Sequence, residues 1–352
     1  MSNAAPPFAI AQAVLFVFLN LDRVVFARRD AVDLRWRWRH LWASAPRLNI
    51  DAKGFTSQSS FIKFVDALLI SRGCIPLKSF WLRADGPDIF LDNFRDTAYL
   101  WICYALRNNV EELGLIDQWT VPELFQLHYC PLTSSCLKKL HLCYVNIDDH
   151  AIKKLFSGCP ALEDLEMVNC EMFATELSSA TLKSQSIDCV DLPKPGYCYL
   201  NCHIVINMPS LHSLHVGALL GDPMLSLVDV QSSECEYSVQ DDTHLCGVVF
   251  ANLITLSLSD WCLYDNCKPL LYLLEHSPNL EKLTLKMTQL HFREYLDSSF
   301  TAAAVVSATQ FNCEKLRNVE IICPKGDTVV GMLLTMLLTK LMSPPVITIK
   351  PF

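Results

Sequence analysis

One short apolar pattern, L-x-x-L-x-L, recurs along this chain of 352 residues. In most copies the last three positions alternate apolar, polar and apolar, which is the two-residue period of a half-buried strand. A single strand of this kind cannot bury its apolar face alone, so the copies must stack on one another. The copies begin at Leu77, Val110, Leu137, Leu162, Leu211, Leu253, Leu280 and Leu316, and a weaker copy begins at Leu182.

The segments between these strands change to helical spacing. Apolar residues in Ile152–Phe156 precede Gly158-Cys159-Pro160, and those in Leu270–Leu274 precede Ser277-Pro278, where glycine and proline favour the end of a helix. Strand, turn and helix at a period of about 27 residues predict an α/β fold, a leucine-rich-repeat solenoid with a curved parallel sheet and outer helices. The alternative is an ordinary α/β domain with leucine-rich strands.

The C-terminal segment is expected to close this stack. Asp327–Leu341 is apolar on nearly every face of a helix, Ser343-Pro344-Pro345 stops it, and Val346–Phe352 suits a final edge strand. The apolar stretch within this helix and the one at Ala9–Leu21 are both too short to span a bilayer. We therefore expect no membrane partner.

Composition limits the class of protein and its location. The 16 cysteines lie scattered in apolar runs, which is typical of buried free thiols in a reducing compartment, so we expect a cytoplasmic and/or nuclear protein. The net charge is −8, although residues 22–47 hold seven arginines against three aspartates. One short basic segment in an acidic chain argues against a general nucleic-acid-binding protein.

Motifs for catalysis and metal binding are absent from the sequence. It contains no G-x-x-x-x-G-K-[ST], G-x-G-x-x-G, G-x-S-x-G, H-E-x-x-H or C-x-x-C. The nearest cluster of metal ligands, Cys198, Cys202 and His203, has a spacing that matches no common zinc template. We expect no enzyme, no catalytic residue, no cofactor and no bound metal.

The basic segment is the most specific feature of the N-terminal region. Ala31–Trp42 reads AVDLRWRWRHLW, and on a helix Leu34, Trp38, Leu41 and Trp42 form one apolar stripe. Alternating Arg and Trp side chains can stack on single-stranded nucleic acid. Here the stripe places the aromatic rings toward a core, so no nucleic-acid partner is expected.

Four segments of the chain resemble a known family. Trp38–Trp42 followed by Ser44–Asp51 resembles the end of an F-box in the plant F-box/leucine-rich-repeat (FBD-like) proteins, and residues 135–142, 159–165 and 313–321 resemble repeats of that family. The Leu-Pro-Asp/Glu motif that begins such an F-box is missing. The resemblance therefore implies a partial or degenerate helical F-box region at 1–50 and a solenoid with a C-terminal cap at 51–352.

The resemblance also implies a function. Proteins of this kind are substrate-recognition subunits of SCF-type cullin-RING ubiquitin ligases, which bind a Skp-type adaptor and cullin through the F-box and a target protein through the repeats. In this chain Leu34, Trp38, Leu41 and Trp42 correspond to the F-box core or to the side that faces the adaptor. The alternative is a leucine-rich-repeat scaffold that binds proteins outside such a ligase and has lost the adaptor.

The strand pattern predicts which residues meet the target. Positions 1, 4 and 6 point into the core, so positions 3, 5 and 7 line the concave face of the sheet, which runs from acidic to basic along the chain. The candidate target-binding residues are Lys139, His141, Asp164, Glu166, Ser213, His215, Thr255, Ser257, Lys282, Thr284 and Lys286.

Overall fold

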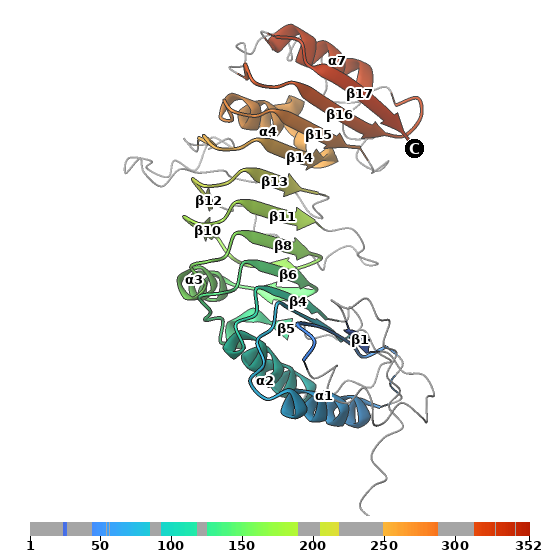
Figure 1. Cartoon of the computed structure of the whole chain (residues 1–352). Coiled ribbons are helices and arrows are strands. Elements are labelled where there is room, and N and C mark those ends of the chain that lie inside the picture. Colours follow the sequence, from blue (N-terminus) through green and yellow to red (C-terminus); the bar gives the residue numbers. More distant parts are fainter. Residues whose placement is uncertain are drawn as a thin grey trace, which may run out of the picture. The chain divides into compact units, whose positions relative to one another are not determined.

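The structure is a computed structural model of the chain (Figure 1). It describes residues 24–26, 44–53, 55, 57–84, 93–117, 125–188, 205–217, 249–287, 313–327, 329–341 and 343–352. The chain divides into two compact units. The first unit comprises Met1–Asn146 and Ser157–Leu162, and the second unit comprises Ile147–Phe156 and Glu163–Phe352.

The first unit contains a parallel sheet of repeat strands. Its strands pair in the order β1 (Val24–Phe26), β2 (Arg47–Asp51), β3 (Ser79–Arg83), β4 (Glu112–Ile116) and β6 (Lys139–Cys143). The register places equivalent positions side by side, so the leucines and other apolar residues of the repeats form continuous buried rows. The boundary predicted at residue 50 falls inside β2. A short second pairing joins β5 (Phe125–Gln126) to β7 (Val145–Ile147).

Two helices of the first unit pack through aromatic side chains. In α1 (Gln58–Arg72) the Oγ of Ser57 caps the N-terminus by accepting a hydrogen bond from the Ser60 N–H at 3.3 Å. The buried ring of Phe61 lies 5.7 Å from that of Trp101 in α2 (Asn93–Arg107). The Trp101 indole N–H also donates to Asp66 at 2.8 Å. These contacts hold α1 against α2.

The second unit repeats the same design. Its parallel strands pair in the order β8 (Asp164–Val168), β11 (Ser184–Asp188), β13 (Ser213–Val216), β14 (Thr255–Ser259), β15 (Lys282–Lys286), β16 (Asn318–Cys323) and β17 (Val346–Pro351). Shorter strands β9 (Glu171–Met172), β10 (Glu176–Ser178) and β12 (Val205–Asn207) follow or precede them. The α/β fold with parallel leucine-rich-repeat strands is therefore confirmed.

The helices predicted from leucine spacing are present. Helix α3 (Asp149–Gly158) ends at the predicted glycine, and α4 (Tyr264–Glu275) follows a 3₁₀ turn at Asp260–Leu263 and ends just before Ser277-Pro278. Helix α7 (Val329–Lys340) and strand β17 form the predicted C-terminal cap (Figure 1). No helix in the described part of the chain is both long and apolar enough to cross a membrane.

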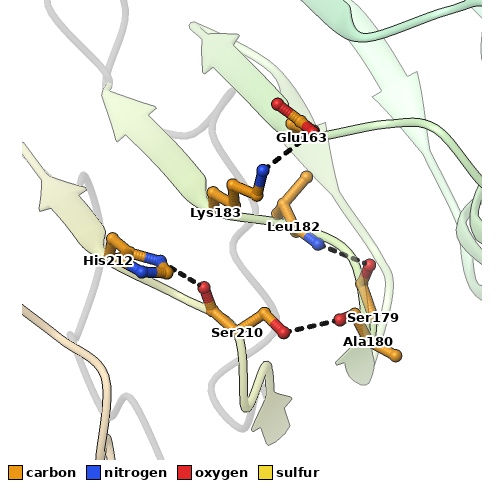
Figure 2. Close-up of polar contacts among 7 residues, drawn as sticks. All are labelled: Glu163, Ser179, Ala180, Leu182, Lys183, Ser210 and His212. Atoms are coloured by element: carbon orange, nitrogen blue, oxygen red, sulfur yellow. Dashed lines mark hydrogen bonds and ion pairs between the residues drawn. The ribbon is translucent and has the colours of Figure 1, made fainter.

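Small polar side chains connect successive turns of the second unit (Figure 2). The Ser179 hydroxyl accepts a hydrogen bond from the Leu182 N–H at 3.3 Å, just before β11. In the next turn the Ser210 hydroxyl donates to the Ala180 carbonyl at 2.7 Å. Beside these turns Lys183 and Glu163 form an exposed ion pair at 2.8 Å, also drawn in Figure 2. Turns that precede neighbouring strands are thus hydrogen-bonded to one another.

Asparagines continue this connection toward the C-terminus. The Asn252 side chain donates to the Pro209 carbonyl at 2.8 Å, and the Asn279 side chain donates to the Ala251 carbonyl at 2.6 Å. Each bond reaches one repeat back along the chain. Each bond joins a turn carbonyl of one repeat to a side chain of the next repeat. The register of neighbouring strands is stabilised in this way.

Candidate functional site

The polar face of each repeat sheet carries the candidate binding residues. Burial alternates along the strands, so that in β6 Leu140 and Leu142 are buried while Lys139 is exposed and His141 is half-buried. The same alternation in β8, β11 and β13 places positions 3, 5 and 7 of the repeat on the side away from the core. Thr284, at position 5 of its repeat, is an exception to this alternation, because it is only 8% exposed.

The predicted set of residues divides between the two units. Lys139 and His141 belong to the first unit, and the other nine belong to the second. We call the two surfaces the first-unit face and the second-unit face, defined by strand positions 3, 5 and 7 of their repeats. The acidic-to-basic sequence of charges predicted above from Asp164 to Lys286 lies wholly on the second-unit face.

The acidic end of the second-unit face lies on β8 and β11. Asp164 and Glu166 project from β8, and in register with them β11 presents Ser184 and Ser186. Asp188, at the end of β11, lies 3.4 Å from Nε2 of His215 on β13. The repeat pattern places Asp188 on this face, although it was not among the predicted residues.

Hydroxyl groups occupy the middle of the second-unit face. Thr255 and Ser257 of β14 lie in register with Ser213 and His215 of β13. Their side chains are half-buried and offer neutral donors and acceptors. Ser259 ends this strand with a different role, because its buried hydroxyl donates to the Lys286 carbonyl at 3.0 Å and holds β14 to β15.

The basic end of the second-unit face surrounds one glutamate. On β16 the carboxylate of Glu320 lies 2.6 Å from Nζ of Lys350 on β17 and 3.9 Å from Nζ of Lys282 on β15. The hydrogen bond from Lys350 and the charges of Lys350, Lys282 and Lys286 lower the pKa of the Glu320 carboxyl, although desolvation opposes them. Glu320 therefore stays ionised among these lysines at neutral pH.

Glu320 and Lys350 were not predicted from the sequence. Glu320 occupies position 5 of the repeat that begins at Leu316, so the pattern already contained it. Lys350 lies in β17, whose V-I-T-I-K sequence has the strand alternation but lacks the leading leucine of the motif. The strand itself was predicted at Val346–Phe352, but Lys350 was not assigned to the face because the strand was not read as a repeat.

An aromatic cluster of Trp81 and His141 lies on the first-unit face. The Trp81 ring lies over Gly114 of the next strand, where any Cβ would collide with the six-membered ring of the indole. Its centroid is 5.0 Å from that of His141, and its N–H donates to Glu112 at 3.0 Å. Only His141 was predicted, yet Trp81 and Gly114 occupy position 5 of the repeats that begin at Leu77 and Val110.

Two predicted groups lie outside the described residues. They are the F-box stripe of Leu34, Trp38, Leu41 and Trp42, and the cluster of Cys198, Cys202 and His203. The roles assigned to them stay predictions. Within the ranges that the structure describes, no group of three or more His, Cys, Asp or Glu side chains is arranged to hold a metal ion.

The thiols of the described chain lie mostly in the core. Burial raises the pKa of the Cys267 thiol to about 12 and that of Cys313 to about 11. Cys313 also donates to the Leu274 carbonyl at 2.8 Å. Such thiols are poor nucleophiles, since the thiolate is the reactive form.

The first-unit and second-unit faces present charges, hydroxyls and an aromatic ring on strands held in register. Such a surface suits the binding of a macromolecule.

Comparison with known proteins gives one consistent result. Residues 115–224 match the family model of the leucine-rich repeats of the FBD-associated F-box protein At5g56370. The chain is 25% identical over 321 residues to the FBD-associated F-box protein At5g53635 of Arabidopsis thaliana, covering 72% of this chain and 73% of that protein. It is 24% identical to the F-box/FBD/LRR-repeat protein At5g56420 (73% and 71% covered) and 26% identical to the F-box/LRR-repeat protein At3g59210 (70% and 60% covered), both from the same plant.

Proposed function

Because this chain is related to the plant F-box/leucine-rich-repeat proteins, we propose that it is the substrate-recognition subunit of an SCF-type cullin-RING ubiquitin ligase. One observation carries the proposal. The chain combines the F-box-like segment W-R-H-L-W at 38–42 with repeat sheets whose first-unit and second-unit faces are polar. The proposed place of action is the cytoplasm and/or the nucleus.

Such a subunit acts by proximity and carries out no chemistry itself. The segment around Leu34, Trp38, Leu41 and Trp42 binds a Skp-type adaptor, and through it the cullin. The repeat faces hold a target protein near the ubiquitin-conjugating enzyme, which raises the effective concentration of the target lysine. Binding by a preformed sheet also spares the entropy of ordering the surface on each encounter.

Co-expression with a Skp-type adaptor tests the proposal. We expect a stable one-to-one complex that survives gel filtration, and we expect Leu41→Asp to abolish it because a charge disrupts the apolar stripe. The matched control is Lys282→Glu/Lys286→Glu, which alters the second-unit face and should leave the adaptor complex intact. Wild-type protein that is folded and yet forms no adaptor complex would contradict the proposal.

The absent Leu-Pro-Asp/Glu motif favours a second candidate. A scaffold that has lost adaptor binding would still hold partners through its repeat faces. Affinity purification from plant cells separates the two functions, because the ligase subunit brings down adaptor and cullin while the scaffold brings down partner proteins without them.

A further inference from the structure

We propose that the basic end of the second-unit face, formed by Lys282, Lys286 and Lys350 around Glu320, binds an extended acidic peptide segment. The inference rests on the proposed function in one respect, because the partner that carries this segment is the target protein. It adds the chemical class of the target: a stretch of chain that presents aspartate or glutamate side chains.

The strand register places the three lysines around one small area. Lys282 and Lys286 lie four residues apart on β15, about 13 Å along the strand. Lys350 lies two strands away on β17, in the row that contains Lys286 and Ile322, so about 10 Å separates those two strands. In an extended peptide, side chains two residues apart are separated by about 7 Å. Two carboxylates of one peptide therefore fit within reach of the three ammonium groups.

Charge and exposure favour an anionic partner. Three lysines face one carboxylate, so the area keeps a net positive charge. The side chains of Lys282 and Lys350 are 50% and 60% exposed, while that of Glu320 is 20% exposed. The ammonium groups are thus accessible to an incoming carboxylate, and Glu320 lies beneath them. Glu320 holds the lysines in place and also competes with the ligand for them.

The rest of the second-unit face argues for a peptide and against a long polyanion. The hydroxyls of Thr255 and Ser257 lie beside the lysines and can donate to peptide carbonyls or carboxylates. At the other end of the same face Asp164 and Glu166 would repel the backbone of DNA or RNA that extended along it. A short acidic segment, confined to β15–β17, avoids that repulsion.

Fluorescence anisotropy with a labelled peptide tests the proposal on the full-length protein. The probe is a twelve-residue peptide in which glutamate alternates with serine, and its control has glutamine in place of every glutamate. We expect the glutamate peptide to bind at low ionic strength, with an affinity that falls as salt is added. Lys282→Glu or Lys350→Glu should weaken it by about ten-fold or more, because each reverses a charge at the site.

Two further variants distinguish binding at a specific site from a general effect of the protein's net charge. Glu320→Gln removes the competing carboxylate and should strengthen peptide binding by about two- to five-fold, an effect opposite to that expected from damage to the fold. Lys315→Glu is the matched control, because it changes the net charge equally at an exposed turn before β16 and should change the affinity less than about two-fold. Circular dichroism and thermal melts verify that each variant is folded.

Several outcomes would overturn the acidic-peptide site. These are equal binding of the glutamine peptide, an equal loss with Lys315→Glu, weaker binding by Glu320→Gln, and binding only after serine is replaced by phosphoserine. Single-stranded DNA that competes through the same lysines more strongly than the peptide would also overturn it. The adaptor complex is measured in parallel on the wild type. Peptide binding without an adaptor complex refutes only the ligase function, and an adaptor complex without binding of the glutamate peptide refutes only the peptide site.

Discussion

At the scale of the residue, Gly114 and Gly158 are two of the three described glycines at which a Cβ would collide with neighbouring atoms. Gly114 leaves room for the ring of Trp81, and Gly158 faces the backbone carbonyl of Leu132, so that a Cβ at either position meets atoms already in place. Side chains can move aside more easily than backbone. Gly158 is therefore the less tolerant position, while Gly114 governs how Trp81 lies on the first-unit face.

Gly114→Ala is expected to displace Trp81 from the sheet. The added methyl group should lower the free energy of unfolding by about 1–3 kcal/mol, the usual cost of overpacking. In a Trp81→Ala background the same change should cost almost nothing, because the colliding ring is gone. Chemical denaturation of the four proteins gives this double-mutant cycle, and equal costs in both backgrounds would refute the contact.

The buried thiols should resist alkylation in the native protein. Burial raises the pKa of Cys267 and Cys313 to about 12 and about 11, whereas Cys74 is exposed. We expect iodoacetamide at pH 8 to label Cys74 within minutes and to label Cys267 and Cys313 only after unfolding in denaturant. Peptide mass spectrometry locates the label. Rapid native labelling of Cys313 would mean that its packing against Leu274 is wrong.

Glu320 should make a pH-dependent contribution to stability. Its folded-state pKa is lowered by Lys350, so the contribution is present above the unfolded pKa and is lost as the pH falls through the folded value. Relative to Glu320→Gln, the wild type should be more stable by up to about 1 kcal/mol at neutral pH, a typical value for a pair near the surface. Urea unfolding at pH 7 and at acid pH measures this difference. A difference that grows on acidification would contradict the sign.

At the scale of the element, the C-terminal cap shows how an apolar helix is accommodated. Helix α7 buries Leu333, Met336 and Leu337, while its outer side carries Thr335 and Thr339, whose hydroxyls donate to backbone carbonyls four residues earlier. Strand β17 ends the sheet order with exposed side chains. The pair closes the apolar side of the last repeat and leaves the polar side of β17 free to contribute Lys350.

Adjacent leucines of α7 provide a matched test of this cap. Leu337 is fully buried and Leu338 is 54% exposed. Leu337→Ala should lower the free energy of unfolding by about 2–5 kcal/mol, and Leu338→Ala by about 0.5 kcal/mol or less. Thermal and urea denaturation compare the two. Similar losses for both would show that α7 faces the core through a different side.

At the scale of the whole molecule, the chain combines one predicted adaptor segment with two described repeat units. Each unit stacks equivalent strands, so its stability comes mainly from contacts between neighbouring repeats. This design separates binding from folding, because residues on the first-unit and second-unit faces can change without disturbing the buried leucine rows.

We expect the purified protein to contain no stoichiometric zinc. The cluster Cys198, Cys202 and His203 has no usual zinc spacing. Elemental analysis of protein purified without chelator measures the metal content. One zinc per chain, lost together with folding in Cys198→Ser, would show that these residues form a structural site.

The repeat strands, the helices before Gly158 and Ser277, and the C-terminal cap were predictable from the amino-acid pattern alone. The physical reason is that burial with a period of two or 3.6 residues is a local property, visible in any short window. Position 3, 5 and 7 residues such as Lys282 and Glu166 could be assigned to a face for the same reason. Their part in binding a target stays a prediction.

Which side chains contact one another was not predictable in this way, because it depends on the folded arrangement of the strands. Trp81, Gly114 and His141 come together across three strands, and Lys350 reaches Glu320 from a strand 30 residues away. These contacts depend on the register between strands. The intervening turns and helices set this register, and because the repeats differ in length their spacing in the sequence does not reveal it. The division of the predicted face between two units has the same origin, because compactness arises from contacts between residues far apart in the chain.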